Sequence, residues 1–252
     1  MTMSPPLFEY LLRLGDDRLV LGHRLSEWCG HGPILEEDIA TANLALDLLG
    51  QATLFLRLAG QVEGAGRDED ALAYWRDETG FRNLQLVELP RGDFGFTTMR
   101  QFLFDAWSYH LLEALSRSEH AELAAIAAKA QKENRYHLRH SSEWVLRLGD
   151  GTGESRARMQ AALDELWPWT GEFWYQDAVD ASLRAEGIAP DLEPLRAPWE
   201  AMANDVITRA TLTVPGGPMR MTGGRAGRHT EHLGHLLAEM QIVARSHPGG
   251  KW

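Results

Sequence analysis

Residues 36–62 read EEDIATANLALDLLGQATLFLRLAGQV, and this stretch decides the fold class. Its period indicates an amphipathic α-helix, because apolar side chains recur at steps of three and four residues. A cluster of glycines after position 59 ends the pattern. The apolar positions that carry the period are Ile39, Leu44, Leu48, Phe55 and Leu58.

Three more long segments repeat this period, and the rest of the chain reads as shorter helices. The long ones cover residues 5–29, about 97–117 and about 119–148. Short helical pieces are expected at 67–92, 154–168, 170–187, 196–210 and 229–246, and a Gly/Pro-rich stretch at 211–228 predicts loop with one short strand.

Four long helices with a long connection between the second and the third are the ingredients of a ferritin-like four-helix bundle. We therefore predict an all-α fold in a single domain over residues 1–252. Its core bundle covers about 5–149, and additional helices cover about 152–252.

The composition excludes several classes of protein. The chain has 252 residues, is 44% hydrophobic and carries a net charge of -11, which argues against a nucleic-acid-binding surface. No run of about eighteen apolar residues is present, so no membrane span is expected, and the start lacks the pattern of a secretory signal. The single cysteine, Cys29, fits a reducing cytosol and is expected to be a small buried side chain. These features predict a cytoplasmic protein.

Ferritin-like bundles often hold two metal ions with one carboxylate on each of two helices and a carboxylate-x-x-His pair on each of the other two. Three residues before each of the ten histidines, this chain has no Asp or Glu. Acids do lie within the long helical segments, at Asp16, Asp47, Asp105 and Glu133. Gly50 and Tyr136 stand three residues after the second and the fourth of these acids, where histidines would be needed. The pattern is the outline of a di-metal site with half its ligands missing.

Acids within apolar helical runs are costly unless they are paired or hydrogen-bonded. We expect the four acids to form a satisfied polar network. Exposure to solvent and a working metal site remain alternatives.

Two further groups of residues have possible chemistry. Histidines stand three apart near the end of the chain and in the fourth long helix, and packing, capping or surface roles are expected for them rather than metal binding. Three arginines in the Gly-rich stretch could meet the phosphates of a CoA ester, although no phosphate-binding loop motif is present. These residues are His229, His232, His235, His137, His140, Arg220, Arg225 and Arg228.

Several long blocks resemble the C subunits of the bacterial ring-1,2-phenylacetyl-CoA epoxidase family, from about residue 7 to Trp252. They are LGDDRLVLGHRLSEWCGHGP (14–33), ANLALDLLGQA (42–52), FLFDAW (102–107), KENRYHLRHSSEWVLRLGDGT (132–152) and HTEHLGHLLAEMQ (229–241), with the terminal tryptophan.

The resemblance implies a ferritin-like fold and a role in phenylacetate catabolism. In that family the catalytic A subunit holds a di-iron centre and epoxidises the aromatic ring of phenylacetyl-CoA, with electrons that a reductase subunit takes from NADPH. The C subunit resembles a copy of A that has lost its ligands. By position, Asp16, Asp47, Asp105 and Glu133 would match degenerate carboxylates, and Gly50 and Tyr136 would match lost histidines.

The implied function is that of a non-catalytic structural subunit, with no cofactor of its own and the di-iron centre in its partner. Its partners would be the A subunit and the other subunits of the complex, and the isolated chain is expected to self-associate. Two alternatives stay open. One is an active di-metal oxygenase that uses Asp16, Asp47, Asp105 and Glu133; the other is a stand-alone helical binding protein.

Overall fold

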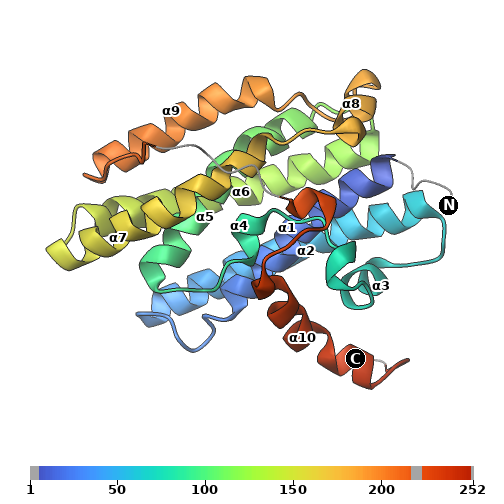
Figure 1. Ribbon diagram of the computed structural model, residues 1–252, viewed down its shortest axis with the longest axis horizontal. Helices are drawn as coiled ribbons and strands as arrows, with labels where there is room; N and C mark the ends of the chain where they lie inside the picture. Colours follow the sequence, from blue (N-terminus) through green and yellow to red (C-terminus); the bar gives the residue numbers. More distant parts are fainter. Residues whose placement is uncertain (1–5, 217–222, 251–252) are drawn as a thin grey trace. The chain divides into compact units, whose positions relative to one another are not determined.

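The computed structural model describes residues 6–216 and 223–250, and every regular element in these ranges is helical (Figure 1). The α-helices are α1 (Pro6–Ser26), α2 (Leu35–Glu63), α3 (Glu69–Tyr74), α4 (Gln85–Glu88), α5 (Phe94–Leu115), α6 (Ala121–Gly149), α7 (Gly153–Leu166), α8 (Ala178–Ala185), α9 (Glu193–Arg209) and α10 (Glu231–Ser246). The 3-10 helices are η1 (Glu78–Gly80), η2 (Trp167–Trp174) and η3 (Gly224–Ala226).

The all-α prediction is confirmed, and the four long helices lie where the apolar period places them. The fold fits a ferritin-like helical bundle, with α1 and α2 as one long pair and α5 and α6 as the other. Two local expectations differ from what the described residues show. The helix expected at 170–187 is divided into η2 and α8, because Asp177 has an extended backbone and caps a new helix by accepting a hydrogen bond from Val179 N. Residues 211–216 and 223–228 contain no strand, and the rest of the stretch in which one was expected, 217–222, lies outside the described residues.

The chain forms two compact units. The first runs to Pro90 and resumes at Thr222, so its described elements are α1 to α4, η1, η3 and α10. The second runs from Arg91 and contains α5 to α9.

In the first unit, α1 and α2 lie side by side (Figure 1). They pack closely because glycines on α1 face α2. A Cβ on Gly15 would lie 2.7 Å from Leu56 Cδ2, and one on Gly22 would lie 3.1 Å from Leu49 Cγ. The loop before α2 is held by Asp38, whose carboxylate accepts hydrogen bonds from the backbone N–H groups of Gly30 and Gly32 at 3.1 Å each.

In the second unit, α7 and α9 pack on the α5–α6 pair, and an aromatic cluster fills the space beside them. Trp199 is fully buried and stacks on Trp167 with ring centroids 5.4 Å apart, while Trp107 stacks on Phe173 at 5.0 Å. The Trp199 indole donates a hydrogen bond to the Leu103 carbonyl at 3.3 Å. Most tryptophans of this unit are therefore core residues.

Two observations differ from what the composition predicts. Cys29 is exposed rather than buried, because it lies in the turn after α1, beyond the face that packs on α2. Among the described helices, α2 is long and apolar enough to cross a membrane by length and composition, although no membrane span was expected. Buried positions make up 44% of its most apolar window, and core helices of soluble proteins meet the same criterion.

Two glycine substitutions test the close approach of α1 and α2. Gly15→Ala should destabilise the protein by about 1–3 kcal/mol, because the new methyl group overlaps buried Leu56. Gly50→Ala should stabilise it by about 0.5–1 kcal/mol, because nothing lies within 4 Å of the new Cβ and alanine favours a helix. Urea unfolding followed by circular dichroism measures both, and equal effects of the two variants would contradict this packing.

Candidate functional site

The second unit contains a buried carboxylate that is surrounded by hydrogen-bond donors. Asp105 of α5 is fully buried. It accepts hydrogen bonds from Gln101 Nε2 at 2.7 Å, Ser141 Oγ at 2.9 Å and Asn134 Nδ2 at 3.5 Å. The amide oxygens of Gln101 and Asn134 make no hydrogen bond among the described residues. Both amides therefore turn their donor ends toward the carboxylate.

Burial dominates the electrostatics of this group. Loss of water around Asp105 raises the pKa of its carboxyl to about 7. The electrostatic interaction with His137 and the hydrogen bonds from Ser141 and Gln101 oppose that rise. His137 is itself fully buried. Asp105 thus titrates near neutral pH inside the folded unit.

On α6, the sequence pattern predicted that Glu133 and Tyr136 face the interior, but the residues that do so are the next ones along the chain, Asn134 and His137. Asn134 and His137 are buried, whereas Glu133 is half-buried and Tyr136 is 46% exposed. The amide of Asn134, rather than the carboxylate of Glu133, is the α6 group that faces Asp105 at this level. The sequence does contain a pattern that could have identified these residues, because Asn134 stands three residues before His137. An amide-x-x-His pair has the metal-ligand spacing without the carboxylate.

In the first unit, Asp16 of α1 is fully buried and is paired with an arginine. Both of its carboxylate oxygens face the guanidinium of Arg76, with Nη1 2.9 Å from Oδ2 and a second bond from Nη2 to Oδ1. The backbone N–H of Arg82 also donates to Oδ2, at 2.9 Å. The sequence pattern did not indicate Arg76, because it lies 60 residues away in a connecting segment.

The other two predicted positions of the first unit lie on the outer part of α2. Asp47 is half-buried and Gly50 is exposed. The buried polar residue of this part of α2 is Gln51, whose Oε1 accepts a hydrogen bond from Arg18 Nε at 3.0 Å. Arg18 is fully buried and lies over the Phe55 ring at 4.9 Å, and burial lowers the pKa of its guanidinium to about 10. Sequence reasoning missed this pair.

These contacts do not fit a di-metal site. The oxygens of Asp16 are occupied by a guanidinium, which repels a metal cation, and those of Asp105 are occupied by neutral donors. Within residues 6–216 and 223–250, no three His, Cys, Asp or Glu side chains lie close enough together to hold a metal ion. Asp16 and Asp47 belong to the first compact unit, and Asp105 and Glu133 to the second.

The histidines near the end of the chain include a structural one. His229 Nδ1 lies 3.0 Å from Glu88 Oε1, and Nε2 lies 3.1 Å from the Phe81 carbonyl. Glu88 is buried and also accepts hydrogen bonds from Thr230 N and Oγ1, at 2.8 Å each. Burial lowers the pKa of His229, but the bonds to Glu88 and Phe81 and the charge of Glu88 outweigh it, so the pKa is raised. Both ring nitrogens of His229 are therefore used in hydrogen bonds within the protein. Together with the bonds from Thr230 to Glu88, they hold the start of α10 against α4.

The three arginines of the Gly-rich stretch were considered as contacts for the phosphates of a CoA ester. Arg225 is buried and forms a two-bond ion pair with Asp17, at 2.9 Å for each bond. It is therefore not free to meet a phosphate, contrary to what the sequence allowed. Arg228 is exposed, and Arg220 lies outside the described residues.

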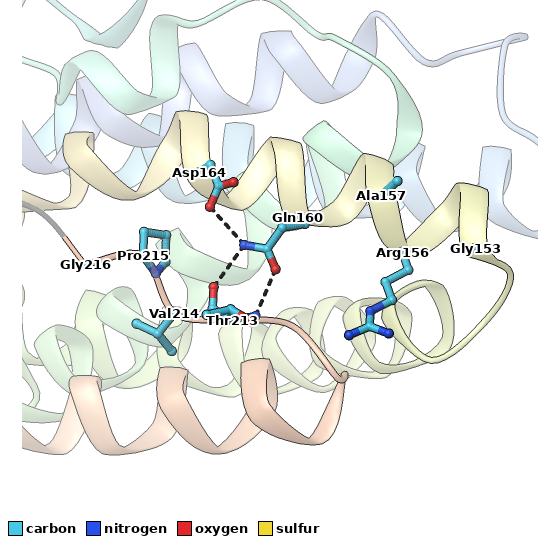
Figure 2. Close-up of a pocket in the computed structure, with 9 residues that line it drawn as sticks. All are labelled: Gly153, Arg156, Ala157, Gln160, Asp164, Thr213, Val214, Pro215 and Gly216. Carbon is cyan, nitrogen blue, oxygen red and sulfur yellow. Dashed lines mark hydrogen bonds between the residues drawn. The ribbon is translucent and has the colours of Figure 1, made fainter.

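A shallow groove of about 590 Å³ lies between α7 and the segment that follows α9. Figure 2 shows the residues that line it. Gln160 spans it. Its side chain accepts a hydrogen bond from Thr213 N at 2.8 Å and donates to the Thr213 carbonyl at 2.9 Å. None of the predicted site residues lines this groove. Its observed contacts hold the chain segment onto α7.

The fold and these contacts define an all-α, ferritin-like protein in which a buried acid of each unit is engaged by protein donors. The chain belongs to the family described as phenylacetic acid catabolic protein, whose model matches residues 2–252. It is 53% identical over 246 residues to the C subunit of 1,2-phenylacetyl-CoA epoxidase from Escherichia coli (strain K12), and the match covers 98% of this chain and 99% of that protein.

The raised pKa of Asp105 predicts a pH-dependent stability. The native carboxyl binds its proton up to about pH 7, whereas the unfolded carboxyl loses it near 3.8. Stability should therefore fall as the pH rises between these values, by up to about 1.4 kcal/mol per pH unit. The measurement is the urea concentration at the midpoint of unfolding, for the wild type and for Asp105→Asn. The midpoint of the wild type minus that of Asp105→Asn should decrease as the pH rises from 5 to 7.5. The exposed Glu165→Gln serves as control, and a constant difference between wild type and Asp105→Asn would contradict the prediction.

The raised pKa of His229 predicts a change in the next pH range. Because the native pKa lies above the ordinary value of 6.5, the contribution of His229 is fully present below that value. It is lost as the pH rises through the native pKa. Thermal unfolding from pH 6 to 9 should show this loss in the wild type and in the exposed control His235→Gln, but not in His229→Gln. Parallel curves for all three proteins would refute the assignment.

Proposed function

We propose that this chain is a non-catalytic structural subunit of a multicomponent oxygenase that epoxidises the aromatic ring of phenylacetyl-CoA. In this proposal it pairs with the di-iron catalytic subunit and stabilises it, and it holds no metal of its own. The observation that carries the proposal is the ion pair of buried Asp16 with Arg76, which places a fixed positive charge against a carboxylate of α1.

Two further features support the same conclusion. Asp105 has its oxygens filled by amide and hydroxyl donors, and the histidine beside it, His137, is preceded at the ligand spacing by the amide of Asn134. A carboxylate ligand needs at least one free oxygen that faces the metal. The acids thus serve hydrogen bonding.

The similarity to a named protein supports the assignment to an oxygenase assembly. The E. coli protein that matches along almost the whole chain is named as the C subunit of 1,2-phenylacetyl-CoA epoxidase. A multi-subunit setting suits an acidic protein with exposed apolar side chains on α2. The free exposed thiol of Cys29 is compatible with the reducing cytoplasm, where we place the complex.

Reconstitution tests the proposal. The purified chain alone should not turn over phenylacetyl-CoA with reductase and NADPH, and the catalytic subunit together with this chain should. The two should also co-elute in gel filtration. Turnover by this chain alone would contradict the proposal, and full activity of the catalytic subunit without this chain would contradict its structural role.

A substitution separates the proposal from the alternative of an active di-metal site. Glu133→Gln keeps the size of the side chain and removes its charge. The assembled epoxidase should keep its kcat within about twofold, because Glu133 binds no metal in the proposal. If Glu133 were a ligand, the loss should exceed the roughly 10- to 100-fold that even outer-shell changes cost. A loss of that size would contradict the proposal.

A further inference from the structure

The outer face of α2 carries an uncovered apolar stripe. Leu35, Ile39 and Leu46 are 72%, 54% and 64% exposed. They are four and seven residues apart, and these steps place them on one side of a helix. Most large apolar side chains elsewhere in the described chain are buried, so three such residues in line on one helix are unusual for a free surface.

The same side of α2 has space for a neighbouring helix. Gly50 lies one turn after Leu46, is exposed, and would carry a Cβ with nothing within 4 Å. Thr53 continues the line and is half-exposed. From Leu35 to Thr53 the stripe is roughly 27 Å long at the rise of an α-helix. A protruding leucine beside an open glycine suits the interdigitation of two helices.

The acidic residues beside the apolar stripe of α2 favour a partner that carries positive charge. Beside the stripe the helix carries the acids Glu36 and Asp47, and its one basic residue, Arg57, is already bonded to Glu69 at 3.1 Å. A helix that lies on a membrane surface typically has Lys and Arg on its polar face, which α2 lacks. A second copy would bring the same net charge of -11, whereas a partner with basic residues beside an apolar stripe would be attracted.

We infer that the α2 stripe of Leu35, Ile39 and Leu46 is the docking surface for a helix of a different subunit, which carries an apolar stripe bordered by Lys or Arg. The inference rests on the proposed function, since the catalytic subunit of the epoxidase is the partner that it assigns. In it, Leu46 and the space at Gly50 form the centre of the contact, and Glu36 lies at its edge.

Binding of purified variants to the purified catalytic subunit, followed by biolayer interferometry, tests the surface. Leu46→Glu should weaken the affinity at least about tenfold, as expected for a central apolar contact. Leu46→Met should keep it, because size and apolar character are retained. Ile242→Glu is the matched control, since Ile242 is 58% exposed on α10 of the same unit. Glu36→Lys should reduce the association rate most at low salt. Circular dichroism verifies that each variant is folded.

The other outcomes are distinguishable. If the wild type binds the catalytic subunit and Leu46→Glu binds equally well, the surface is wrong while the proposed function stands. If the wild type does not bind, both fail. If Leu46→Glu instead disperses a homodimer in analytical ultracentrifugation, or abolishes flotation with phosphatidylcholine–phosphatidylglycerol vesicles, the occupant is a second copy or a membrane and the inference is overturned.

Discussion

Two adjacent buried acids of α1, each held by an arginine from a distant segment, organise the first compact unit. Asp16 is paired with Arg76, and Asp17 with Arg225, 208 residues further along the chain. The backbone N–H of Arg82 donates a further hydrogen bond to Asp16, and that of Leu84 donates one to Asp17. An uncompensated buried charge costs several kcal/mol, so the segments that supply these partners must stay in place. The start of α10 is then fixed nearby by His229 and Glu88.

The sequence predicted the long helices well, because apolar side chains at steps of three and four report which face is buried. Leu44, Leu48, Phe55 and Leu58 of α2 are buried as this period requires, whereas Ile39, which belongs to the same pattern, is 54% exposed. It also located the acids of the helix interiors, and Asp16 and Asp105 are fully buried. The prediction of a satisfied polar network is supported for these two, since each has several donors.

The partners could not be predicted in the same way. Arg76 and Arg225 lie in irregular segments, where no period indicates the direction of a side chain. On α6, one residue changes the helix face by about 100°, and this separates buried Asn134 from half-buried Glu133. Cys29 was misjudged for a related reason, because it follows the last turn of α1 and no helix face constrains it.

We conclude that, in a fold that can hold metal ions, an arginine occupies the carboxylate of Asp16, and amide and hydroxyl donors occupy that of Asp105. Elemental analysis of the isolated protein, expressed with iron supplied, tests it most directly. We predict far less than one iron, or any other transition metal, per chain. About two iron atoms per chain would contradict the claim, because the guanidinium of Arg76 and the donors around Asp105 would then have to move aside for the metal.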